Sequence, residues 1–392
     1  MRMNLITKQY LKERFQNYYK NNSVNPPVDY PSREWGFILF DEMPQIVMRR
    51  HKSFGSAGEV NEYLEGMVPS HCYYSVAYYR YPAASTMKEK DWLGADLIFD
   101  LDADHLPGAP TSYSEMLEHV KTETFKLYDF LEDDFGFSED DIQIVFSGGR
   151  GYHLHINDPC VHDLDSSQRR EIVDYISSTG LSIDSMFSKK QVSGDAGQEN
   201  AKISSFPGEN SGGWEKRINN FIISYLQRII KKDNAVDLLS SYNGIGKKRA
   251  KTLIDIINNE DEIDLLRNGK IGNLSKMPVG FIKQIAYAGI NEMIANVDEP
   301  VTSDIKRLIR LPGSLHGGSG MKVTVLSSSE LDTFDPLTDA VVFGNESVEI
   351  NVKRPYSLNM KGKEFCVEEG IYNLPEYAAI HLICRGVAEY GS

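Results

Sequence analysis

The stretch Leu97-Ile98-Phe99-Asp100-Leu101-Asp102-Ala103-Asp104 has the pattern of an apolar β-strand that ends in closely spaced carboxylates. Side chains alternate along a strand, so Leu97, Phe99 and Leu101 are expected to pack on one side. Asp100 and Asp102 would point to the other side, with their Cα atoms about 7 Å apart. Two carboxylates at that separation can share two metal ions about 3.5–4 Å apart, as phosphoryl transfer requires. An acidic turn after a buried strand is the alternative interpretation.

The composition is that of an ordinary globular protein. The chain has 392 residues, of which 41% are hydrophobic and 25% charged, enough for two or three domains. Its formal net charge of -14 requires any nucleic-acid surface to be a local basic patch. Four scattered cysteines support neither a disulfide framework nor a cysteine-based metal site. No apolar run reaches the roughly 18 residues of a membrane span, so we expect a cytoplasmic protein without membrane contact.

The first third of the chain predicts a helix followed by strands. Thr7 can cap a helix that runs to about Lys20. Strands are expected at residues 45–48 and 71–81, and an amphipathic helix at residues 112–131. Arg50 lies in a short cationic run that could meet phosphates, although a solvated strand end has the same composition.

A glycine-rich turn joins two further strand patterns. Residues 142–147 and 152–156 predict a hairpin around Gly148-Gly149-Arg150-Gly151. Glycines allow backbone N–H groups to approach an anion closely, and Arg150 with His153 could supply charge to a triphosphate. A structural turn with two surface histidines is the alternative.

The last third of the chain contains a second glycine-rich turn. Ser303 is a plausible N-cap for a short basic helix that contains Arg310. The glycine-rich turn at residues 311–320 follows, and then a strand at 321–326. Pro375 is expected to open a final apolar helix that extends to about Tyr390.

Residues 165–290 have helical periodicity, most clearly at 214–231 and 234–259. Gly244-Ile245-Gly246 joins two apolar helices and resembles the helix-hairpin-helix module. In that module hairpin amides bind a nucleic-acid phosphate while nearby lysines add charge. The candidate DNA contacts are Gly244, Gly246, Lys247, Lys248 and Lys251. The alternative is an ordinary glycine-joined helix pair with a basic surface.

Three separated segments carry a resemblance to a known family: Asp100–Asp102, Ser147–His153 and Arg307–His316. Together they resemble the small catalytic subunit of archaeal and eukaryotic replicative DNA primase. Arg33–Phe37, Arg50 and the closing segment Leu374–Gly391 are also similar to the family. The resemblance spans nearly the whole chain, in the expected order.

The resemblance implies an α/β (α+β) fold, with a primase-polymerase catalytic core of mixed sheets at residues 1–165 and 291–392. A mainly helical insertion would occupy residues 166–290. By motif position, three carboxylates would hold two Mg²⁺ or Mn²⁺ ions: Asp100, Asp102 and Asp298. The residues expected to contact the incoming triphosphate, or to lie near it, are Ser147, Arg150, His153, His316, Arg310 and Arg50.

Asp298 is preferred to Asp304 as the third metal ligand. Pro300 disfavours helix at Glu299 and so places Asp298 in an extended segment. Asp304 would instead follow the N-cap Ser303, where the helix dipole explains a negative side chain.

The implied partners are an iron–sulfur primase large subunit in a heterodimer, a single-stranded DNA template, and ribonucleoside triphosphates, with deoxynucleotides a further option. Members of the family commonly carry a zinc-binding knuckle soon after the catalytic strand. Residues 105–128 contain no cysteine and only His105 and His119, so a structural zinc ion is not expected.

Two other functions fit parts of the sequence. Phe99-Asp100-Leu101-Asp102 also resembles the start of a haloacid-dehalogenase phosphatase, whose first Asp is a covalent nucleophile, with Gly194-Asp195 as a downstream acidic motif. That family has Thr or Val where this chain has Asp104. A non-catalytic DNA-binding subunit that uses residues 244–251 is the other alternative.

Overall fold

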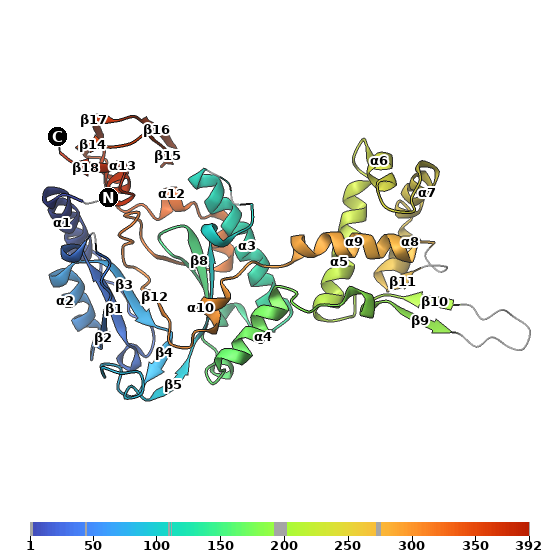
Figure 1. Cartoon of the computed structure of the whole chain (residues 1–392), viewed down its shortest axis with the longest axis horizontal. Helices are drawn as coiled ribbons and strands as arrows, with labels where there is room; N and C mark the ends of the chain where they lie inside the picture. Colours follow the sequence, from blue (N-terminus) through green and yellow to red (C-terminus); the bar gives the residue numbers. More distant parts are fainter. Residues whose placement is uncertain are drawn as a thin grey trace, which may run out of the picture. The chain divides into compact units, whose positions relative to one another are not determined.

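The computed structural model describes residues 3–43, 45–108, 110, 112–191, 202–271 and 276–391. The chain divides into two compact units. The first comprises Met1–Glu132, Phe137–Val173 and Asn296–Ser392, and the second comprises Asp133–Gly136 and Asp174–Ala295. Both contain helices and strands, which confirms the α/β fold class (Figure 1). Within the described ranges, none of the helices combines the length and the apolar character that a bilayer crossing requires.

Two four-stranded sheets form the centre of the first unit. In strand order, the first consists of β12 (Leu308–Arg310), β3 (Pro69–Ser75), β1 (Trp35–Leu39) and β2 (Arg49–Lys52). The second consists of β13 (Thr324–Leu326), β7 (Ile142–Phe146), β8 (Gly151–Ile156) and β6 (Leu97–Asp102). All strand pairs among the described residues are antiparallel, whereas mixed sheets were expected. Short turns such as the one between β7 and β8 join only antiparallel neighbours.

The other strands of the first unit lie in smaller sheets: β17 (Gly370–Pro375), β14 (Ser347–Val352) and β18 (Ala388–Tyr390); β15 (Tyr356–Met360) and β16 (Lys363–Val367); β4 (Ala77–Tyr79) and β5 (Trp92–Ala95). Its helices are α1 (Leu5–Asn21), α2 (Ala57–Met67), α3 (Tyr113–Asp133), α4 (Ser166–Ile176), α10 (Glu299–Ser303), α11 (Ser328–Thr333), α12 (Pro336–Asp339) and α13 (Glu376–Cys384). The last residues of α3 and α4 are counted with the second unit.

The second unit is mainly helical. Its helices are α5 (Gly213–Ile229), α6 (Ala235–Ser240), α7 (Lys247–Ile257), α8 (Glu260–Arg267) and α9 (Val279–Met293). A small antiparallel sheet contains β11 (Lys270–Ile271), β10 (Lys202–Ser205) and β9 (Ser188–Gln191). Gly194 and Asp195, the downstream motif of the phosphatase alternative, lie outside the described residues.

The acidic strand has the predicted alternation. Leu97, Phe99 and Leu101 of β6 are fully buried, while Asp100 and Asp102 keep part of their surface in solvent. β8 lies between β6 and β7, and all its residues are buried. The hairpin predicted around residues 148–151 is therefore confirmed as the centre of this sheet.

Several predicted boundaries of helices and strands were wrong. The first helix begins at Leu5 because Asn4, not Thr7, caps it: the Asn4 side chain accepts the Thr7 N–H at 2.7 Å. The strand expected at residues 45–48 begins only at Arg49, and the one at 71–81 divides into β3 and β4. The final helix ends at Cys384, and the chain then pairs with β14 as β18.

The basic helix predicted after Ser303 does not form. Ser303 instead ends α10, and Arg310 lies on β12, where it pairs with Tyr73 of β3. Strand pairing between segments far apart in sequence overrides the local capping pattern. Asp304 accepts the Lys306 N–H at 2.9 Å in the turn between α10 and β12, so the helix-dipole explanation for its charge does not apply.

Gly151 allows β6 and β8 to approach closely. A Cβ atom at this position would lie 2.0 Å from the carbonyl oxygen of Leu101. We expect Gly151→Ala to destabilise the fold by about 1–3 kcal/mol, the usual cost of overpacking. Gly66 of α2 is the matched control, since nothing among the described residues lies within 4 Å of a Cβ placed there. Gly66→Ala should be neutral or stabilise by about 0.5–1 kcal/mol. Urea unfolding followed by circular dichroism measures both, and equal effects would contradict this account of the strand packing.

Candidate active site

The pairing of β6 with β8 places a carboxylate opposite an imidazole. Asp100 is the cross-strand partner of His153, and the His153 Nε2 lies 3.5 Å from a carboxylate oxygen of Asp100. Burial lowers the pKa of His153 well below its usual range, and the charges of nearby histidine and arginine side chains lower it further. His153 is therefore neutral at pH 7, with one ring nitrogen directed at the acidic strand.

The turn between β7 and β8 lies at the end of the sheet where β6 ends in Asp102. Gly148 has a φ of +74°, which favours glycine, and a Cβ there would lie 2.8 Å from the Cβ of His316. Ser147 accepts the Gly149 N–H through its hydroxyl at 3.3 Å. Arg150, the one charged residue of the turn, lies 2.5 Å from a carboxylate oxygen of Asp104 and 3.7 Å from one of Asp102. The turn thus carries a cation directly to Asp102, the last residue of β6, and to Asp104 just after it.

His316 projects from the second glycine-rich turn against the first. Its Nδ1 accepts the Gly318 N–H at 3.1 Å, which leaves Nε2 as the protonated nitrogen of a neutral ring. Burial lowers the pKa of His316 well below its usual range, and Arg310 and His71 add to that effect. His316 is therefore a neutral hydrogen-bond donor at pH 7.

Arg310 enters the site from the other four-stranded sheet. Its guanidinium donates to His71 Nδ1 at 2.7 Å and lies 5.0 Å from the centre of the Tyr73 ring. Burial and the Arg310 charge lower the pKa of His71 to about 3, so His71 stays a neutral acceptor. A guanidinium remains charged inside proteins, so the strand pairing delivers a fixed positive charge.

One cavity of about 450 Å³ collects these side chains. Seven residues that the sequence singled out line it: Asp100, Asp102, Ser147, Arg150, His153, Arg310 and His316. The structure adds Tyr73, Arg307 and Arg385, which the sequence analysis did not identify as site residues. Two of them lie in family-like segments, Arg307 in Arg307–His316 and Arg385 in Leu374–Gly391, but neither was singled out there. The cavity therefore combines two carboxylates with four arginines.

Asp298 lies beside this cavity without being part of its lining. Its backbone N–H donates to the Asp100 carbonyl at 3.0 Å, so the two aspartates are neighbours. Asp298 has an extended conformation (φ -77°, ψ 95°), as Pro300 predicted, but Glu299 is helical and begins α10. Proline is tolerated in the first turn of a helix, where N–H groups have no partner within the helix, so it did not exclude a helical Glu299.

Arg50 does not line the cavity. Its guanidinium donates to both carboxylate oxygens of Glu34, at 2.9 and 3.0 Å. Glu34 is fully buried, and the Lys90 ammonium lies 3.7 Å from one of its carboxylate oxygens. The two cations offset the cost of burying the Glu34 carboxylate, so this geometry explains Arg50 without a nucleotide.

The carboxylates have the chemistry that a hard divalent cation requires. Asp100 and Asp102 present oxygen ligands at the cavity, with side chains 21% and 31% exposed. Among the described residues, no three His, Cys, Asp or Glu side chains form a ready-made metal-ligand cluster. Mg²⁺ is commonly held by one or two carboxylates together with substrate phosphates and water, so the two aspartates fit that ion.

The glycine hairpin of the second unit is exposed. A Cβ at Gly244 or Gly246 would have no described atom within 4 Å, and Gly246 is the N-cap residue of α7, which has no side-chain cap. Ile245 between them is buried and anchors the hairpin. Lys247 lies 3.0 Å from Asp237, while Lys248 and Lys251 are exposed on α7. Helix amides and ammonium groups are therefore available on one surface of this unit.

The comparisons with known proteins agree on one family. The family model described as DNA primase small subunit matches residues 99–327. The DNA primase small subunit PriS of Methanococcoides burtonii is 59% identical, with 99% of this chain and 100% of that relative covered. The subunit of the same name from Methanosarcina acetivorans is 50% identical, with 99% and 98% covered. These matches favour neither the phosphatase nor the non-catalytic alternative. The chain belongs to the family of DNA primase small subunits.

Proposed function

We propose that this chain is the cytoplasmic catalytic subunit of a DNA primase, which synthesises short primers on single-stranded DNA by template-directed nucleotidyl transfer with release of pyrophosphate. The observation that carries this proposal is the single cavity that unites the Asp100 and Asp102 carboxylates with four arginines. Carboxylates and cations serve opposite needs in such a reaction, because metal ions need the former and a triphosphate needs the latter.

Asp100 and Asp102 would hold two Mg²⁺ or Mn²⁺ ions, and Asp298 would complete the set from the start of α10. Such ions, when bound, lower the pKa of the attacking 3′-hydroxyl and neutralise charge on the departing pyrophosphate. Asp298 is suited to this role because its backbone is hydrogen-bonded to Asp100. Structural zinc is not part of the proposal.

The incoming triphosphate would lie against the two glycine-rich turns. Arg150 and Arg310 supply charge-assisted hydrogen bonds, and the Ser147 hydroxyl and the Nε2–H of His316 supply neutral ones. His153 would orient Asp100 through its Nε2. His71 and Tyr73 hold Arg310 in place, so its charge is preorganised before the nucleotide arrives. We assign Arg50 a structural role with Glu34.

The first unit would be the catalytic core and the second a DNA-binding insertion. The relatives are named small subunits, and we propose that this chain likewise pairs with a larger, iron–sulfur subunit in a heterodimer. Ribonucleoside triphosphates are the proposed substrates, with deoxynucleotides as a second option.

Substitutions of two aspartates that are close together in sequence test the assignment of Asp298 as a metal ligand. We expect Asp298→Asn to lower template-dependent nucleotide incorporation about a hundredfold or more, because metal ions contribute several kcal/mol to the transition state. Asp304→Asn is the matched control, since Asp304 is exposed and bonded only within its own turn among the described contacts. It should keep most activity. A primer-synthesis assay with Mg²⁺ or Mn²⁺ compares them, with circular dichroism as a folding check. The opposite pattern would identify Asp304 as the ligand.

If the hairpin at residues 244–251 binds DNA phosphates, its lysines contribute to the salt dependence of DNA binding. Replacing Lys248 and Lys251 by Gln should weaken binding of single-stranded DNA uniformly across sequences. It should also reduce the slope of log K against log salt by about 0.7 for each phosphate that is no longer neutralised. Replacing Lys231 and Lys232 by Gln, at two exposed sites that follow α5, is a control that removes the same net charge. A slope that falls no more than in this control would favour a helix pair whose basic surface does not touch DNA.

A further inference from the structure

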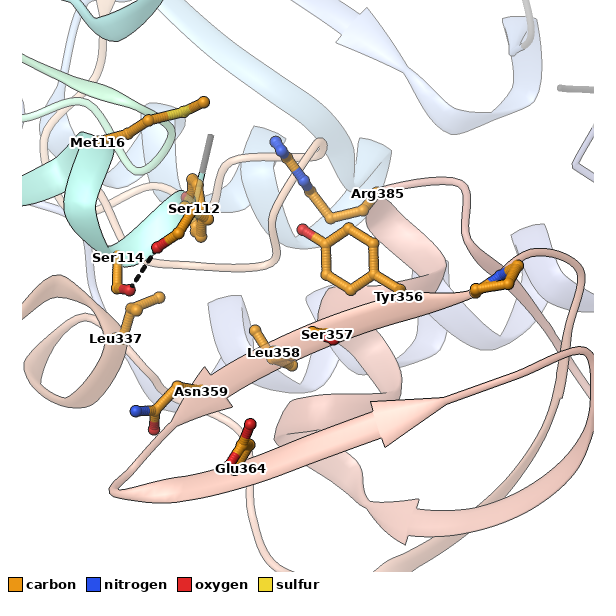
Figure 2. Close-up of a pocket in the computed structure, with 12 residues that line it drawn as sticks. Ser112, Ser114, Met116, Leu337, Tyr356, Ser357, Leu358, Asn359, Glu364 and Arg385 are labelled. Atoms are coloured by element: carbon orange, nitrogen blue, oxygen red, sulfur yellow. Dashed lines mark hydrogen bonds between the residues drawn. The ribbon is translucent and has the colours of Figure 1, made fainter. Parts of the chain in front are cut away.

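A second cavity of about 690 Å³ lies in the first unit (Figure 2), and it shares a lining residue with the proposed active site. We call it the β15 pocket because strand β15 forms one side of it, opposite the start of α3 and the helix α12. Arg385, which follows α13, lines both this pocket and the active-site cavity. The two cavities therefore share one cationic side chain.

The wall between the two cavities is held by specific interactions. The Tyr113 hydroxyl donates to the Gly149 carbonyl at 2.5 Å, which ties the start of α3 to the glycine turn of the active site. The Arg385 guanidinium lies 4.9 Å from the centre of the Tyr113 ring. A molecule in the β15 pocket would thus lie directly beside the turn proposed to bind the triphosphate.

The lining of the pocket has the chemistry of a nucleoside site. Tyr356 offers an aromatic ring, and Figure 2 shows it next to Arg385. Apolar side chains form the sides of the pocket: Met116, Leu337 and Leu358. Among them lie hydroxyl and amide groups that can bond to a base or sugar: Ser112, Ser114 and Asn359. Every base has a π-face, so an aromatic ring can stack on any sequence.

The charge of the pocket distinguishes between a free nucleoside triphosphate and a nucleic-acid strand as its occupant. Arg385 is the one cation among its described lining residues, and Glu364 is an acid at the same pocket. A free nucleoside triphosphate carries several negative charges and needs several cations, as the active-site cavity provides. A nucleic-acid strand carries one phosphate charge per nucleotide, which a single arginine can match.

We infer that the β15 pocket binds an unpaired base of the single-stranded DNA template, with Tyr356 stacked on the base and Arg385 in contact with the adjoining phosphate. This inference rests on the proposed function. A template base ahead of the reaction has no partner to pair with, and stacking on a side chain beside the reaction site would keep the strand in position.

The test is a pair of binding measurements on the full chain. Fluorescence anisotropy with a short labelled oligothymidylate measures DNA affinity, and titration with a fluorescent ATP in the presence of Mn²⁺ measures nucleotide affinity. We expect Tyr356→Ala to weaken DNA binding between about fivefold and a hundredfold. Tyr356→Phe keeps the ring and should stay within about twofold of the original protein. Tyr81→Ala, which removes a 60% exposed tyrosine outside this pocket, is the matched control.

Each outcome decides the question. Lower DNA affinity with unchanged ATP affinity supports a template pocket. Lower ATP affinity with unchanged DNA affinity would show a mononucleotide site instead, and no change in either would also overturn the inference. If Tyr356→Ala loses its circular dichroism spectrum, Asn359→Ala replaces it, with a loss of DNA affinity of about threefold or more expected from one lost hydrogen bond. Neither assay requires turnover, so a failure of the proposed chemistry in the incorporation assay would be seen separately.

Discussion

The site depends on the antiparallel register of β6 and β8. That register pairs Asp100 with His153 and Asp102 with Gly151, so the carboxylates and the glycine turn come to the same end of one sheet. A shift by one residue would turn Asp100 into the core, because strand side chains alternate. The close approach at Gly151 fixes the register, since a side chain there would collide with the backbone of β6.

The sheet that contains β12 adds a further positive charge to the site. β12 pairs with β3 and carries Arg310 to the carboxylates of β6, and the Arg310 guanidinium donates a hydrogen bond to His71. Neutral histidines beside it are a consequence of burial, which disfavours their charged forms. They can donate or accept hydrogen bonds without adding positive charge to a cavity that already contains four arginines. The arrangement resembles a preorganised anion site in which few groups need to move.

Short-range patterns in the sequence predicted the acidic strand and the hairpin around Arg150, because alternation and turn glycines are local signals. The features that the sequence analysis missed depend on contacts between residues far apart in the sequence. β12 has three residues and is a strand only because β3 pairs with it, so a local cap at Ser303 predicted a helix instead. Arg50 resembled a phosphate ligand because its buried partner Glu34 lies sixteen residues away in the sequence and is brought to it by the fold. Arg385 lies in the family-like segment Leu374–Gly391, but no residue pattern marked it as a site residue, since only tertiary packing brings it to the cavity.

The central claim is that Asp100 and Asp102 form a divalent-cation site at the cavity they share with the arginines. Anomalous diffraction from crystals soaked with Mn²⁺ and a nucleoside triphosphate tests it most directly. The account predicts manganese peaks within bonding distance of both carboxylates, close to the distance of about 2.0–2.1 Å that Mg²⁺ adopts, and no such peaks in Asp100→Asn crystals. Manganese bound only elsewhere, with these carboxylates still paired to His153 and Arg150, would contradict it.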